Sequence, residues 1–443
     1  MASNVIVDIF KIPELRRRVL FTLLLLVIFR LGALIPIPGV NIGVIKAAHE
    51  AQRQSGEGFA FSEYLDFFSG GAFSNYSLLM LGIMPYISAQ IIMQVLTLVF
   101  PLLKRMLEED GGRRKFQRYV RIGTIVVAIV QGFASATSVL NIENGIVPGL
   151  NHVSFMMIAI LSIVAGTMFL VWLGEQITQR GVGNGTSLLI FTGIVARIPS
   201  SLTQLVVEMR LGTLNPVLVL AAIGLFALII FLVIFEQQGE RKIPVNYAKR
   251  IVGRQMMQAQ NSYIPFKINP SGVIPIIFAS SILTFPLQIL GPIATPGSWI
   301  SKIVMALSFD GLWYNIIYAL LIVFFAYFYT QVSLNPIEVS RQIREHGGNI
   351  PGVRSENLET YLQGILNRII LPGALFLAII AILPSLVVQW FGLPMSVAQL
   401  LGGTSLLIIV GVDLDTMSQI EGHLKMHQHD GIVSRARVRT RSI

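Results

Sequence analysis

Ionisable side chains inside long apolar stretches are the first candidates for chemistry in this sequence, because charges at membrane depth normally belong to ion or proton pathways. Arg30 alone lies well inside such a stretch, whereas Glu236, Asp413 and Asp415 lie near the ends of theirs. We interpret these end groups as hydrated at the membrane surface rather than as a relay. Their scarcity argues against an ion-coupled transporter of small solutes.

Two further motifs have spacings that could bind a ligand. The segment Arg180-Gly-Val-Gly-Asn-Gly-Thr-Ser187 is similar to a phosphate-binding loop, but it lacks the lysine and the preceding strand that such loops need. We interpret it as a tight turn into a helix. His423, His427 and His429 could ligate a metal by spacing, yet without cysteine or clustered carboxylates a solvated tail is the better interpretation. No nucleophile, base and orienting group occur together, so we assign no catalytic site, metal or cofactor.

The composition indicates which elements must position these groups. Hydrophobic residues make up 53% of the 443 residues and charged residues only 13%, against roughly 25% charged residues in soluble proteins. A membrane-spanning helix needs about 20 apolar residues. Windows of that length fall at 19–38, 75–99, 119–139, 154–174, 185–205, 214–235, 272–291, 312–334, 369–390 and 397–417. The sequence therefore predicts an all-α polytopic membrane protein with ten transmembrane helices. No small-residue cleavage site follows the first window, so we interpret it as a retained span and not as a signal peptide.

The distribution of Lys and Arg predicts the orientation of the chain. If the N-terminus is cytoplasmic, 27 of the 33 basic residues lie on the cytoplasmic side, 5 lie on the other side, and Arg30 lies within the first span. This split follows the positive-inside rule and predicts that both termini face the cytoplasm. The chain has no cysteine, so redox chemistry gives no second indication of orientation.

The segment 59–73 breaks the pattern of spans. It is aromatic and apolar but too short and too charged to cross a membrane. A segment of this kind at membrane depth must be buried in the protein, which predicts a short re-entrant segment. A helix lying on the outer membrane surface is the alternative.

A weak internal repeat divides the chain. Gly82-Ile-Met-Pro-Tyr-Ile-Ser-Ala89 and Gly272-Val-Ile-Pro-Ile-Ile-Phe-Ala279 agree at Gly, Pro, Ile and Ala, and each opens the second helix of a group of five. Because five is odd, the second group must enter the membrane inverted. The sequence thus predicts two inverted five-helix halves with a route between them, as in many transport proteins.

Two long cytoplasmic loops, 236–268 and 335–368, combine apolar and basic residues. We interpret them as docking surfaces for a partner, and attraction to anionic lipid head groups is the alternative. The candidate docking residues are Arg241, Lys242, Lys249, Arg250 and Arg354.

Six segments, in order along nearly the whole chain, resemble motifs of the SecY family. They are Phe68-Ser-Gly-Gly71, Gly82-Ile-Met-Pro-Tyr-Ile-Ser88, Arg180-Gly-Val-Gly-Asn-Gly185, Val245-Asn-Tyr-Ala-Lys-Arg250, Pro351-Gly-Val-Arg354 and Gly402-Gly-Thr-Ser-Leu-Leu-Ile408. The resemblance implies an hourglass channel between the two halves, a short plug helix at about 62–73, and a lateral gate beside the second and seventh spans. We expect an N-terminal half at 1–210, a C-terminal half at 211–420 and a basic cytoplasmic tail at 421–443.

The resemblance also implies roles for individual residues. The pore constriction would be lined by a ring of isoleucines, namely Ile83, Ile87, Ile190, Ile194, Ile274, Ile277 and Ile408. The plug would include Tyr64, Leu65, Phe67, Phe68, Ser69, Gly70 and Gly71. A flexible apolar ring can close around a moving polypeptide without binding it, and a narrow apolar constriction excludes water and ions. Thr186 stands where another aliphatic ring residue is expected.

The implied function is passage of unfolded polypeptides across the bacterial inner membrane and lateral release of apolar segments into the bilayer, with no enzymatic step in this chain. The implied partners are SecE-like and SecG-like membrane subunits, the SecA motor ATPase or a ribosome at the cytoplasmic loops, signal sequences and anionic lipids. A small-solute secondary transporter with inverted repeats is the alternative. Such a transporter needs polar groups at mid-membrane, where this sequence offers mainly isoleucine.

Overall fold

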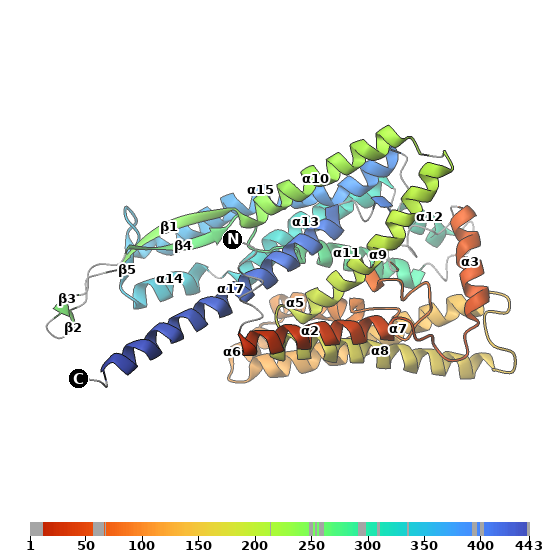
Figure 1. The fold of residues 1–443 in the computed structure, drawn as a ribbon, viewed down its shortest axis with the longest axis horizontal. Coiled ribbons are helices and arrows are strands. Elements are labelled where there is room, and N and C mark those ends of the chain that lie inside the picture. The colour runs from red at the N-terminus through yellow and green to blue at the C-terminus, as the bar shows by residue number, and fades with distance from the viewer. Residues whose placement is uncertain are drawn as a thin grey trace. The chain divides into compact units, whose positions relative to one another are not determined.

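The computed structural model describes residues 12–55, 66, 68–212, 214–247, 251–252, 255–256, 261–290, 298–307, 311–334, 336–391, 397–398 and 403–440. Within these residues every one of the ten predicted windows contains a helix (Figure 1). The ten helices are α2 (Pro13–Gly32), α5 (Met84–Val99), α7 (Gly112–Leu140), α8 (His152–Arg180), α9 (Gly185–Arg210), α10 (Pro216–Gln238), α11 (Ile274–Leu290), α13 (Leu312–Ser333), α15 (Leu358–Phe391) and α17 (Gly403–Thr440).

Shorter elements connect these helices. They are α3 (Ile42–Ser55), α6 (Pro101–Glu108), α12 (Trp299–Ala306), α14 (Pro336–Glu345), the 3₁₀ turn η2 (Ser355–Asn357), and the strands β1 (Glu240–Tyr247), β2 (Ile251–Val252), β3 (Gln255–Met256), β4 (Asn261–Lys267) and β5 (Gly348–Asn349).

Six helices among the described residues are long and apolar enough to cross a membrane, and a seventh span results if α5 and α6, bent by 107°, are counted together. The other predicted spans coincide with α2, α11 and α17, each of which is too charged, too short or too polar to count as a spanning helix by length and composition. α2 contains Glu14, three arginines at 16–18 and Arg30 within 20 residues, whereas α11 has only 17 residues. α17 carries Asp413 and Asp415 and continues into a polar stretch.

The first predicted window differs from its helix at one end. α2 stops at Gly32, and the chain beyond it forms an isolated bridge between Pro36 and Ser77. Proline has no N–H to continue a helix and restrains the residue before it to extended conformations. Pro36 therefore favours extended chain at the end of this window, and Pro38 lies in the turn that follows.

The internal repeat is visible in the backbone. Gly82 and Gly272 have φ of +57° and +58°, and each precedes by two residues the start of its helix, α5 or α11. In the first motif the amide of Gly82 donates to the carbonyl of Leu79, and the amides of Tyr86 and Ile87 donate to that of Ile83. In the second motif, 190 residues later, Gly272 donates to Asn269, and Ile276 and Ile277 donate to Val273. Glycine is needed because a positive φ strains residues with a Cβ. The two motifs thus build the same turn into a helix.

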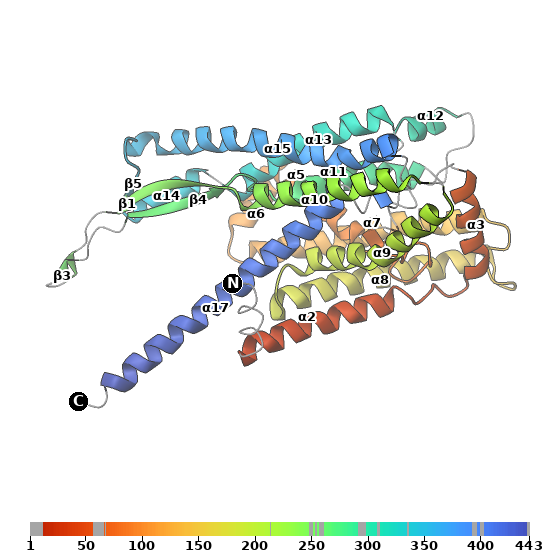
Figure 2. The ribbon, with the colours of Figure 1, turned by 45° about the horizontal axis from the view of Figure 1, so that its top comes forward.

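The chain divides into two compact units. The first comprises residues 1–205, 284–308 and 408–443, and the second comprises 206–283 and 309–407. In the first unit α7 packs against α5 and α8, and α2 lies along α8 (Figure 2). Around Phe155, Ile163 and Met80, each at most 1% exposed, a cluster of apolar side chains forms a core of this unit.

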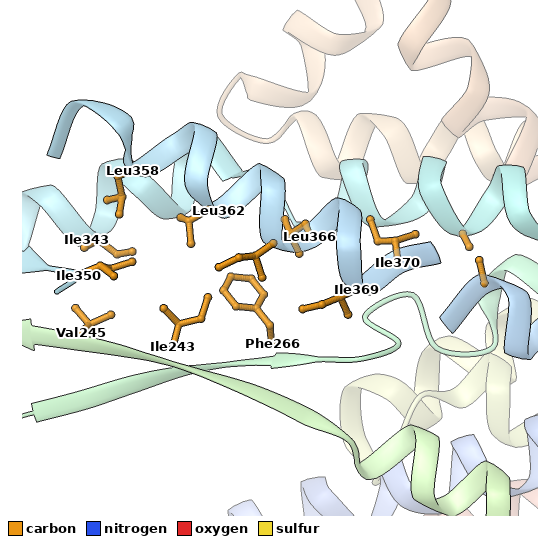
Figure 3. Close-up of a cluster of buried hydrophobic side chains, with 13 residues drawn as sticks. Ile243, Val245, Phe266, Ile343, Ile350, Leu358, Leu362, Leu366, Ile369 and Ile370 are labelled. Atoms are coloured by element: carbon orange, nitrogen blue, oxygen red, sulfur yellow. The ribbon is translucent and has the colours of Figure 1, made fainter. Parts of the chain in front are cut away.

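The second unit contains a small sheet that supports the cytoplasmic loops. β1 pairs with β4 and β5 in an antiparallel sheet of order β4-β1-β5. Strand residues Ile243, Val245 and Phe266 point toward Leu362 and Leu366 of α15 and form a continuous buried cluster (Figure 3). Ile350, from the loop after β5, joins the same cluster, so the two long loops share one core.

Candidate functional site

One face of α9 carries two of the predicted ring residues. Ile190 and Arg197 each lie three or four residues from Gly193 and Ile194, so the four residues form one stripe on the helix surface. The side chains of Ile190 and Ile194 are 6% and 0% exposed. Along the helix the stripe thus contains an isoleucine, a glycine, a second isoleucine and a charge.

The described part of the predicted plug, Asp66 and residues 68–73, forms with Ser74 a tight turn that we term the plug turn. The carbonyl of Asp66 accepts hydrogen bonds from the amide of Gly71 at 2.9 Å and from Ser69 Oγ at 3.3 Å. Its carboxylate Oδ1 accepts one from the amide of Ser74 at 2.8 Å. Gly70 and Gly71 have φ of +67° and +91°, a backbone conformation that favours glycine. Asp66 therefore organises the turn through both its main chain and its side chain.

The plug turn lies directly against the backbone of α9. A Cβ added to Gly70 would come within 2.8 Å of Gly193 Cα, and a Cβ added to Gly193 would come within 2.6 Å of the Phe68 carbonyl oxygen. Real side chains do not tolerate such distances, so both positions need glycine. The close approach places the plug turn on the stripe that carries Ile190 and Ile194.

Two arginines bind the plug turn. Arg30 of α2 donates from Nη1 to the Gly70 carbonyl at 2.7 Å. Arg197 of α9 forms an ion pair with Asp66 Oδ2, and the two side chains are 22% and 3% exposed. The plug turn is thus fixed from α2 and from α9 by charged groups.

The remaining ring candidates fall in both units. In the first unit Ile83 precedes α5, Ile87 lies in its first turns and Ile408 lies near the start of α17, with exposures of 6%, 7% and 1%. In the second unit Ile274 and Ile277 lie in the first turn of α11 and are half-buried. Their joint role as a constriction stays a prediction. Tyr64, Leu65 and Phe67 of the predicted plug lie outside the described residues.

The candidate docking residues occupy one sheet and one loop of the second unit. Arg241 and Lys242 lie on β1, and Lys242 Nζ is 4.8 Å from the centre of the Tyr263 ring on β4, a cation–π contact. Arg354 is exposed and directly precedes η2, and its carbonyl accepts the amide of Asn357 at the end of that turn. Its guanidinium is therefore presented from a hydrogen-bonded turn. Lys249 and Arg250 lie outside the described residues.

The glycine-rich segment after α8 is the predicted tight turn into a helix. Its amides at Val182 and Gly183 donate to Thr22 Oγ1 and to Gln419 Oε1, each at 3.0 Å. The segment thus joins α2, α9 and α17 within the first unit. Thr186 lies in the first turn of α9, where its hydroxyl donates to Asn184 Oδ1 at 2.7 Å. Asn184 Oδ1 also accepts the amide of Thr186 at 3.2 Å, so the Asn184 side chain caps the start of α9 and the Thr186 hydroxyl holds it in place.

The interpretation of the helix-end carboxylates as hydrated is compatible with the exposure of two of them and is wrong for the third. Asp413 and Asp415 are exposed. Glu236 is only 7% exposed, and its Oε1 lies 3.8 Å from the position of a Cβ on Gly373. α15 packs along α10 and covers this end of the helix, an effect that hydropathy does not reveal.

The sequence analysis missed Asp66 and Arg197 as functional candidates. Asp66 was within the predicted re-entrant segment, and Arg197 was counted only as a basic residue on the outer side. The spacing of Arg197 from Ile190 and Ile194 was a usable signal, since it places a charge on the same helix face. The partner of Arg30 was unpredictable, because it is a main-chain carbonyl 40 residues away.

A bundle of apolar helices with an inserted plug turn defines a class of polytopic membrane channel folds, and solved structures agree. A structure of a protein-conducting channel aligns with TM-score 0.64 and 19% identity over 93% of this chain and 95% of that one. Sec61 in a canine ribosome–channel complex aligns with TM-score 0.61 and 18% identity over 93% of this chain and 95% of its own.

Sequence relatives narrow the class to a family. A SecY profile matches residues 77–417. Protein translocase subunits SecY from Borreliella burgdorferi and Escherichia coli are 43% and 41% identical, covering 96% of this chain and 96% and 95% of their own lengths. The relative from Aquifex aeolicus is 42% identical over 98% of this chain and all of its own. This chain belongs to the SecY family and is a multi-pass membrane protein.

Proposed function

We propose that this chain is the central pore-forming subunit of a SecYEG-type translocon. It passes unfolded polypeptides across the bacterial inner membrane and releases apolar segments laterally into the bilayer. The supporting observation is the plug turn seated on the α9 stripe beside Ile190 and Ile194 in a chain that matches protein translocase subunits over nearly its full length. The chain is a channel subunit and not an enzyme, so the energy for transport comes from a partner.

The ring isoleucines and the plug form the resting seal in this proposal. Aliphatic side chains make a constriction that excludes water, while a plug turn on one side of it blocks the route that remains. A small-solute transporter, the rival function, would bind its substrate with polar groups at mid-membrane. The ring candidates on α9 are instead buried isoleucines, and the nearby charges are engaged with the plug turn.

The partners follow from the family and from the exposed loops. Sec61 was solved in a ribosome–channel complex, which supports a translating ribosome as one cytoplasmic partner. The SecA motor is the other, with Arg241, Lys242, Lys249, Arg250 and Arg354 as contacts. SecE-like and SecG-like subunits complete the complex in the membrane. The boundary between the proposed N-terminal and C-terminal halves lies near residue 210, close to the change of compact unit at 205/206, while residues 284–308 and 408–443 group with the first unit.

Reconstitution tests the function. The chain, purified with the small membrane subunits that accompany it, is placed in proteoliposomes with a motor ATPase and a radiolabelled unfolded precursor. We expect ATP-dependent protection of the precursor from external protease. Absence of protected precursor, together with accumulation of a small solute by the same vesicles, would favour the rival function.

The proposed orientation gives a second prediction. With the loops in the cytoplasm, as the 27 of 33 basic residues on that side predict, we expect Arg354→Cys to be inaccessible to an impermeant thiol reagent in intact cells. The cysteine-free chain makes single labels unambiguous, and Arg354→Cys and Arg250→Cys are suitable variants. Lys46→Cys, exposed on α3, is the matched outer control and is expected to label. Labelling of Arg354→Cys from outside would reverse the orientation.

A further inference from the structure

The ion pair between Asp66 and Arg197 is not required by the fold of either segment alone. The plug turn already closes through hydrogen bonds from Gly71, Ser69 and Ser74 to Asp66, and these leave carboxylate Oδ2 for Arg197. Arg197 lies in the middle of α9, whose own backbone bonds need no help from its side chain. The pair therefore connects two elements that are each complete without it.

Because the ion pair is largely buried, separating its two charges costs free energy. Asp66 is 3% and Arg197 22% exposed, so little water screens the attraction. Moving the plug turn off α9 would leave the carboxylate without its cation until water reached it. Removal of one partner of a buried pair is costly because the other charge is left uncompensated, whereas removal of both is far milder.

The ion pair belongs to a set of contacts that hold the plug turn in one position. Gly193 lies one turn before Arg197 on the same face, and the Gly70 backbone is seated against it. The hydrogen bond from Arg30 of α2 to the Gly70 carbonyl holds the same turn. All these contacts are made by the plug turn in one seated position, and none of them survives its displacement.

We infer that Asp66 and Arg197 are positioning residues that latch the plug turn onto α9 and so set how readily the resting channel opens. The inference rests on the proposed channel function. The resting seal then depends both on the apolar ring of isoleucines and on a polar contact, the ion pair that holds the plug turn. A signal sequence that opens the channel must supply differential binding free energy large enough to separate this pair.

The test compares four forms of the complex: the parent, Asp66→Asn, Arg197→Gln and the double variant. Resting ion conductance is measured in planar bilayers, and export of a precursor with a defective signal sequence is measured in cells. We expect each single variant to conduct at least several-fold more than the parent and to export the defective precursor. We expect the double variant to fall below the sum of the two single effects, because the charges act on each other.

Matched controls separate the latch from general damage. Glu14→Gln and Arg18→Gln break an ion pair on α2 whose side chains are 58% and 33% exposed, and they are expected to conduct like the parent. Single variants that insert at parental levels yet conduct like the parent, or strictly additive effects in the double variant, would overturn the latch.

A second measurement serves if the neutral variants insert poorly. In the variant Asp66→Cys/Arg197→Cys, a cleavable bis-maleimide across the two cysteines would hold the plug turn on α9. Export of a normal precursor is expected to stop after cross-linking and to resume after cleavage, and unchanged export by the cross-linked channel would refute the latch.

The parent channel distinguishes failure of the proposed function from failure of the latch. Failure of the parent to export any precursor would count against the proposed function, whereas a working parent with unaffected variants counts against the latch only.

Discussion

Ile87→Asn and Ile408→Asn are expected to make the resting complex leak ions and export precursors whose signal sequences are defective. Both side chains are buried in the first unit, with exposures of 7% and 1%, so an amide there keeps water in an apolar constriction. A loss of about 1.4 kcal/mol in the stability of the closed state raises the open fraction about tenfold. Losing a buried isoleucine commonly costs about 2–5 kcal/mol, so an increase of at least about tenfold is expected.

Ile92→Asn is the matched control for this prediction. It makes the same change in α5, five residues from Ile87, at a side chain that is 46% exposed. It introduces the same polar group into the membrane but outside the proposed constriction. Conductance is read in planar bilayers at matched protein amounts. Equal conductance for Ile87→Asn, Ile408→Asn and the parent would place the gate elsewhere, and equal leakage by Ile92→Asn would trace the leak to general destabilisation.

Arg354→Glu is expected to block most export while the protein still inserts and assembles. Arg354 is exposed at a hydrogen-bonded turn, where it is free to make charge-assisted hydrogen bonds to a cytoplasmic partner. Each such bond contributes roughly 1.5–3 kcal/mol. Loss of one bond therefore weakens docking about tenfold to a hundredfold. Co-sedimentation with the motor ATPase, beside precursor export in the same membranes, measures the effect.

Arg344→Glu separates a specific contact from a general charge effect. Arg344 is exposed on α14 in the same cytoplasmic loop, so the variant has the same change in net charge and a comparable change in local field. Arg344→Glu is expected to retain most of the export. Equal losses in both variants would show that docking depends on the basic field of the loop, and normal export by a stable Arg354→Glu variant would remove Arg354 from the interface.

The helices were predictable because hydropathy over about 20 residues is a local property that the membrane imposes. Each of the ten windows coincides with a helix, and the turn before α5 was marked by a Gly-Ile-Met-Pro motif whose counterpart opens α11. The ends of helices were less predictable. Gly32 ends α2 short of the predicted boundary because Pro36 lies in extended chain that pairs with Ser77.

The environment of single side chains was decided by packing between distant segments. Glu236 is buried because α15 covers the end of α10, while Asp413 and Asp415, with similar sequence context, stay exposed. Hydropathy along one helix contains no information about which neighbour covers it. Lys242 likewise contacts Tyr263 only because β1 and β4 pair in the register that brings them close.

By itself, the sequence determined the membrane class, the ten helices, the repeat and the family, since apolar length, glycine positions and motif order are written along the chain. Only the tertiary structure decided how the plug is held. Asp66 and Arg197 are 131 residues apart, and Arg30 binds a carbonyl 40 residues away. Such pairs form because Gly70 and Gly193 let two backbones touch, and that approach exists only after the helices have packed.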